Sequence, residues 1–112
     1  MDAQIALKVF DALACQARFD IYRLLIRRRP QGLIAGELAR VMDMAPSNLS
    51  FHLKHLVHAG LLDVQQEGRC QRYTANLSRM QALLGFLSDE CCSDSLEACE
   101  PATVEALAIL NT

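Results

Sequence analysis

Three cysteines lie within nine residues near the C-terminus and are the side chains of this sequence best suited to chemistry. Cys91, Cys92 and Cys99 belong to a stretch, residues 88–101, that contains no histidine, lysine or arginine. Thiolates are preferred ligands of soft metals, and clustered thiols also form redox sites. Neighbouring cysteines form a disulfide only with strain. We therefore expect Cys91 and Cys92 to act together on a third body rather than on each other.

The cysteine count also bears on the cellular compartment. The chain has five cysteines, and neither a secretory signal nor an apolar run long enough to span a bilayer is evident in the sequence. We therefore expect a cytoplasmic protein. In a reducing compartment an odd number of cysteines favours metal binding or thiol reactivity over structural disulfides. We expect Cys15 to be a buried structural residue and Cys70 to have no ligand role.

The charges divide the chain into two unequal parts. Residues 1–86 contain eleven Lys or Arg against seven Asp or Glu, whereas residues 87–112 contain six acidic residues and no Lys or Arg. A basic body suits a phosphate backbone, from which an acidic tail is repelled. With 112 residues, 52% of them hydrophobic, the chain is large enough for one core. We predict a folded domain over residues 1–90 and an acidic tail over residues 91–112.

Periodicity and turn residues predict the elements that position these groups. Apolar spacing indicates helices over residues 3–14, 18–29 and 35–42, and a further helix that starts at Pro46 and ends at Gly60. Two short strands follow over residues 61–66 and 70–74, with Gly68 in the turn between them. The predicted fold is mainly α-helical with one β-hairpin.

The helix after Pro46 has an unusual polar face. If Leu49, Leu53 and Leu56 point inward, the remaining positions present donors, acceptors and one aromatic ring but no carboxylate. Such a face suits the major groove of DNA, although a plain solvated helix has a similar composition. The candidate DNA-binding residues of this helix are Ser47, Asn48, Ser50, Phe51, His52, Lys54 and His55.

The hairpin favours the DNA-binding interpretation. A two-helix turn followed directly by a hairpin with a basic tip is typical of a winged helix-turn-helix. Arg69 and Arg72 are then expected to reach the flanking minor groove or the DNA backbone. For the histidines at positions 52, 55 and 58, the same placement favours polar contact with DNA over metal binding.

The run from Glu37 to Tyr73 resembles the ArsR family of bacterial metalloregulatory repressors. Its S-x-H-L-x-x-L-x-x-A-G-L core is followed by E-G-R-x-x-x-Y in the hairpin, and the resemblance covers roughly residues 5–90. It implies a homodimer formed by the first helix and the helix after the wing, bound to an inverted-repeat operator. Independently, five apolar residues after the wing are more than a small monomer readily hides. They are Leu77, Met80, Leu83, Leu84 and Leu87.

The resemblance also narrows the ligand. Family members that bind arsenite through the first helix of the helix-turn-helix have thiols there, whereas residues 34–39 of this chain have none. The paired ligands of the zinc-sensing branch are missing too, because no histidine follows His58. The segment with Cys91, Cys92 and Cys99 instead resembles the branch whose As(III) or Sb(III) site is a Cys-Cys pair plus one more cysteine.

Thiol chemistry is compatible with that branch. Trivalent arsenic and antimony take three thiolates, whereas structural zinc normally takes four ligands. In one continuous helix Cys99 lies about 10 Å along the axis from Cys92, so a three-thiol site requires a bend near residues 93–95. Several alternatives remain open: a methylarsenite site formed by Cys91 and Cys92, cadmium or lead binding, or a disulfide with Cys99 in a redox sensor. A thiol enzyme or metal carrier is disfavoured, because the sequence has no anion-binding loop and no C-x-x-C.

Overall fold

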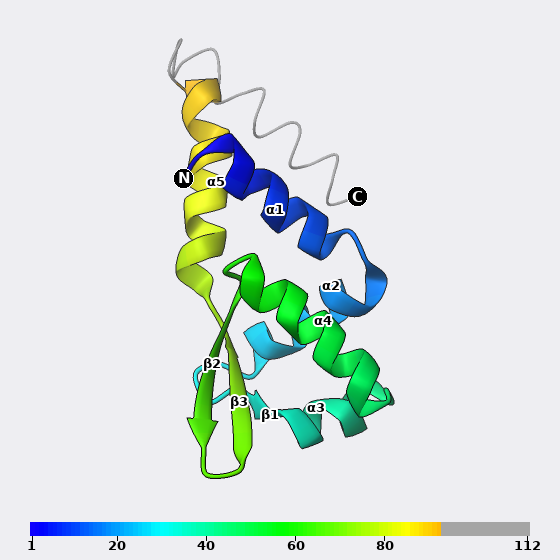
Figure 1. Ribbon diagram of the computed structural model, residues 1–112. Coiled ribbons are helices and arrows are strands. Elements are labelled where there is room, and N and C mark those ends of the chain that lie inside the picture. The colour runs from blue at the N-terminus through cyan, green and yellow to red at the C-terminus, as the bar shows by residue number, and fades with distance from the viewer. Residues whose placement is uncertain (93–112) are drawn as a thin grey trace.

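The computed structural model describes the backbone of residues 1–92 and the side chains through Asp89. In chain order the elements are α1 (Ala3–Leu13), α2 (Gln16–Arg27), β1 (Leu33–Ile34), α3 (Ala35–Met42), α4 (Pro46–His58), β2 (Leu62–Glu67), β3 (Cys70–Ala75) and α5 (Leu77–Cys92). As Figure 1 shows, the β2–β3 hairpin and α5 extend in opposite directions from the body formed by α1 to α4. The predicted winged helix-turn-helix architecture is confirmed.

The helix-turn-helix consists of α3 and α4, and its turn follows from local stereochemistry. α3 ends at Met42, and the residue that caps it, Asp43, adopts a left-handed conformation with φ 51°. Pro46 then occupies the start of α4, where its missing N–H costs no hydrogen bond. The bounds predicted for α3 agree with the structure, as does the left-handed glycine after α4, since Gly60 has φ 81°.

The core is built on the leucines that the periodicity predicted to point inward. Leu49, Leu53 and Leu56 of α4 are all buried, together with Ile21 and Leu25 of α2. Since α4 contacts α1, α2, α3 and β2, it is the central helix of the domain. Packing against these four elements therefore fixes the orientation of α4.

The sheet has one more strand than the sequence predicted. Its order is β1-β3-β2, all antiparallel, and β1 pairs Leu33 with Tyr73. A strand of two residues is too short to produce an alternating pattern, so it gave no signal. The hairpin was predicted within one residue at its ends, and Gly68 forms its turn with φ 60°. Of the β2 residues only Leu62 is buried, so the hairpin projects as a wing.

The apolar faces of α1 and α5 differ in part from the expectation. Leu83 is buried in the core of its own subunit and Met80 packs against that core, so neither is free for a partner. Leu84 and Leu87 remain 58% and 48% exposed. In α1 the buried residues are small, Ala6, Val9 and Ala12, whereas Leu7 and Phe10 are exposed.

Within residues 1–92, no helix is long and apolar enough to cross a membrane.

Candidate nucleic-acid interface

The exposed side of α4 forms a ridge, defined here by Ser47, Phe51, Lys54 and His58. All four side chains are exposed, and Phe51 is 65% exposed although it is a large apolar residue. Asn48 and Ser50 are also exposed, on the two flanks of the ridge. The ridge thus carries one hydroxyl group, one ammonium group, one imidazole and one phenyl ring, without a carboxylate. These groups match the donors and apolar contacts that base edges and phosphates accept.

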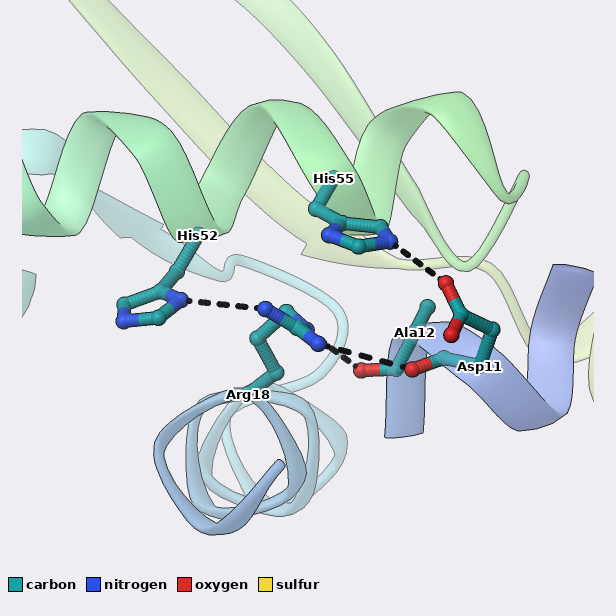
Figure 2. Close-up of polar contacts among 5 residues, drawn as sticks. All are labelled: Asp11, Ala12, Arg18, His52 and His55. Atoms are coloured by element: carbon teal, nitrogen blue, oxygen red, sulfur yellow. Dashed lines mark hydrogen bonds and ion pairs between the residues drawn. The ribbon is translucent and has the colours of Figure 1, made fainter. Parts of the chain in front are cut away.

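Two of the predicted DNA-binding residues of α4 lie beside the other helices. Figure 2 shows the rings of His52 and His55 directed towards Arg18 and Asp11. His55 Nε2 lies 3.1 Å from Asp11 Oδ2, and His52 Nδ1 lies 3.4 Å from Arg18 Nη1. His55 was expected to point outward, but its ring is engaged with the end of α1. The helical phase alone gave no indication of where α1 lies.

Arg18 links the end of α1 to α4. Its Nε donates to the carbonyl oxygen of Ala12 at 2.7 Å and its Nη2 to that of Asp11 at 3.4 Å. Those carbonyls lie at the C-terminal end of α1, where a basic side chain can satisfy carbonyls that lack a helical partner. The carbonyl oxygen of Asp11 also accepts from the backbone N–H of Ala14 at 3.3 Å. Because a guanidinium has no acceptor, His52 Nδ1 must accept the third contact.

The surroundings of His52 favour the neutral form of its imidazole. Burial lowers the pKa of His52 below its ordinary value of 6.5, and the positive charges of Arg18 and His55 lower it further. A neutral imidazole accepts a hydrogen bond from Arg18, and a protonated one does not. Arg18 and Asp11 carried no signal in the sequence, because Arg18 and His52 are 34 positions apart and Asp11 and His55 are 44 apart.

The two arginines of the wing differ in their surroundings. Arg69 is exposed beside the hairpin turn. Arg72 is half-buried: its Nε donates to Glu67 Oε2 at 2.6 Å, and its Nη1 donates to the carbonyl oxygen of Gln31 at 3.3 Å. The guanidinium of Arg72 thus ties β3 to the segment before β1, whereas that of Arg69 is free of protein partners in the part of the chain that the structure describes.

Two grooves of similar size border the ridge. The first, about 420 Å³, lies between α1 and α4, and the second, about 470 Å³, lies between α4 and the wing. Lys54 and His58 line both. Lys8 and Asp11 form the α1 wall of the first groove, and Gln71 belongs to the wing wall of the second.

The cysteines are only partly covered by the structure. Cys91 and Cys92 occupy the last positions of α5, while Cys99, the predicted bend and the acidic tail lie outside the described residues. Residues with described side chains contain no cluster of three metal-binding groups. Cys15, expected to be buried, is only half-buried, and the backbone amide of Arg18 lowers the pKa of its thiol. Cys70 is exposed on the wing.

Comparison with known proteins gives the family. Residues 7–65 match the helix-turn-helix domain family. The chain is 32% identical to the arsenical resistance operon repressor of Bacillus subtilis (strain 168) over 83 residues, and this match covers 74% of each protein.

Two solved structures share the fold. One is the homodimeric winged helix-turn-helix DNA-binding domain Mb0332 from Mycobacterium bovis, a possible ArsR-family transcriptional regulator. It has a TM-score of 0.61 and 27% identity, over 78% of this chain and 81% of that one. The other is the AntR antimony-specific transcriptional repressor, with a TM-score of 0.56 and 25% identity, over 78% of each chain. The chain belongs to the ArsR family of helix-turn-helix transcriptional regulators, whose members are DNA-binding proteins and not enzymes.

Proposed function

We propose that the protein is a cytoplasmic repressor of an arsenic-resistance-type operon, released from its operator when As(III) or Sb(III) binds Cys91, Cys92 and Cys99. The observation that carries the DNA-binding part is the exposed, carboxylate-free ridge of α4 with Phe51 and Lys54 at its centre. Ser47, Asn48 and Ser50 reach base edges or phosphates beside them, and Arg69 contacts the DNA from the wing. His52 and His55 contribute once their contacts with Arg18 and Asp11 exchange for DNA.

The proposed DNA-binding unit is a homodimer. Exposed apolar side chains remain on two helices, Leu7 and Phe10 on α1 and Leu84 and Leu87 on α5. A second copy of the chain covers such faces in a two-fold arrangement. The homodimeric relative from Mycobacterium bovis supports this assignment. Two copies of α4 about 34 Å apart then fit the two halves of an inverted repeat.

The inducer assignment rests on the position of the Cys91–Cys92 pair at the end of α5. Three thiolates complete the coordination of trivalent arsenic or antimony, and the tail beyond α5 supplies the third through Cys99. The similarity to an arsenical resistance repressor and to an antimony-specific repressor supports a metalloid over a divalent cation. The acidic part, residues 91–112, is then the sensing segment and residues 1–90 the DNA-binding and dimerisation unit.

Binding of the metalloid is coupled to the operator through α5. Because the same helix carries the cysteine pair and the exposed Leu84 and Leu87, a site that forms at its end also shifts the dimer interface. A coupling of about 1–3 kcal/mol per site is sufficient to weaken operator binding several-fold or more.

The test is a ligand panel on the operator complex. Fluorescence anisotropy of a labelled duplex from upstream of the gene reports release by arsenite, antimonite, methylarsenite, cadmium, lead, zinc and peroxide. Release by arsenite and antimonite at the lowest concentrations supports the proposal. Release by cadmium or lead alone, or by peroxide without metal, contradicts it.

Cys99→Ser distinguishes the three-thiol site from a two-thiol site. We expect this variant to lose its response to arsenite and antimonite and to retain operator affinity. An unchanged arsenite response in the variant shows that Cys91 and Cys92 suffice, and it overturns the three-thiol site.

A further inference from the structure

With a surface groove on each side, α4 stands out as a single exposed helix that fits the DNA major groove. An α-helix with its side chains is about 10–12 Å across, close to the roughly 12 Å width of that groove. A helix lying there has one sugar–phosphate strand on each side. The wing borders the protein groove on one side of α4, and α1 borders the protein groove on the other side.

The charge of the α1–α4 groove suits a phosphodiester strand. Lys8, Lys54 and His58 line it, and Lys8 has no ion-pair partner among the residues whose side chains are described. One carboxylate lines the groove, that of Asp11, against the two ammonium groups of Lys8 and Lys54. The charged groups of the groove are therefore net positive whether or not His55 stays on Asp11, as a phosphate contact requires.

We propose that α1 is part of the DNA interface: the α1–α4 groove seats the phosphodiester strand on the side of α4 away from the wing, and Lys8 contacts a phosphate there. The inference rests on the DNA-binding function proposed above and extends it to a helix outside the helix-turn-helix. It gives α1 two roles, dimer contact and DNA contact.

The two roles of α1 occupy different flanks of the helix. At 100° per residue Lys8 and Phe10 lie about 160° apart around the axis. Lys8 faces the groove shared with α4, whereas Phe10 is exposed without lining that groove. A partner subunit on the Phe10 flank therefore leaves Lys8 open to DNA.

The test measures electrostatic affinity for DNA, which needs no knowledge of the operator. A labelled duplex of about 30 base pairs and random sequence is titrated with protein at several NaCl concentrations. We expect Lys8→Gln to weaken binding roughly three- to tenfold at about 0.1 M salt, and to reduce the slope of log K against log salt by about 0.9 per subunit. Lys8→Arg, which keeps the charge, should restore both quantities.

Two further variants make the outcome decisive. Arg27→Gln removes the same charge from an exposed residue of α2 outside both grooves, and it should bind like the wild-type protein. An equal loss in Arg27→Gln shows a net-charge effect and overturns the localised contact. If Lys8→Gln binds like the wild-type protein while Lys54→Gln loses affinity for DNA, the role of α1 is overturned and that of α4 is retained. Wild-type binding by both lysine variants overturns the proposed DNA interface itself.

Discussion

Asp11 places a negative charge beside the proposed phosphate strand, so its removal should strengthen DNA binding. We expect Asp11→Asn to raise affinity for random-sequence duplex about two- to fivefold, because one repulsive charge disappears. The unfolding free energy should change by less than about 1 kcal/mol, since the Asp11 side chain in the pair with His55 is 74% exposed. Salt-dependent anisotropy and urea unfolding measure the two effects. Weaker DNA binding by Asp11→Asn argues against a strand in this groove.

His52 should make the stability depend on pH. Its folded-state pKa is lowered below 6.5, first by burial and then by Arg18 and His55, so the unfolded chain binds more protons as the pH falls. The contribution of neutral His52 is therefore fully present above about pH 6.5 and is lost as the pH decreases towards its folded-state pKa. Asp11, the acidic group nearby, is paired with His55.

Urea unfolding of the wild-type protein and of His52→Gln between pH 5 and about 8 tests this. The difference in unfolding free energy should shrink on acidification. A difference that grows at low pH means that protonated His52 is the stabilising form, contrary to the structure.

In α4, the residues that stabilise the fold and those proposed to bind DNA lie on opposite faces of the helix. Leu53 is buried among the core leucines, and Phe51, two residues before it, is 65% exposed. Leu53→Ala should lower the unfolding free energy by about 2–5 kcal/mol through the cavity it leaves. Phe51→Ala should cost less than about 0.5 kcal/mol and weaken operator binding. Parallel urea unfolding and anisotropy measure both, and a strongly destabilised Phe51→Ala contradicts the orientation of α4.

The helices and the wing were predictable because each has a local signal. Pro46 marks the start of α4, Gly60 its end and Gly68 the hairpin turn. β1 was not predictable, because its two residues become a strand only by pairing with Tyr73 and Arg72 of β3. The burial of Leu83 was missed for a related reason. The pattern marked one apolar face on α5 but could not show that part of this face packs on its own subunit.

The candidate site was predictable in part. The inward leucines and the ridge residues of α4 follow from the period of one helix. The contacts of His52 with Arg18 and of His55 with Asp11 do not, because they depend on how α1 and α2 pack on α4.

At the scale of the whole molecule, the exposed apolar residues of α5 should determine assembly. Leu84 and Leu87 are exposed in the single chain, so replacing both with glutamate should leave the subunit folded and place like charges across a two-fold interface. We expect a monomer by sedimentation velocity, with helical content unchanged, and a loss of operator affinity of at least a hundredfold. A dimer that persists in this double variant places the interface elsewhere.

An arsenite titration of the operator complex with single cysteine variants tests the proposed inducer site. Operator release should be complete for the wild-type protein near one arsenite per subunit, and equally so for Cys15→Ser and Cys70→Ser. Cys91→Ser and Cys92→Ser should bind the operator with wild-type affinity and remain bound when arsenite is added. Release of both of these variants at the wild-type arsenite concentration would contradict the assignment of the inducer site to the end of α5.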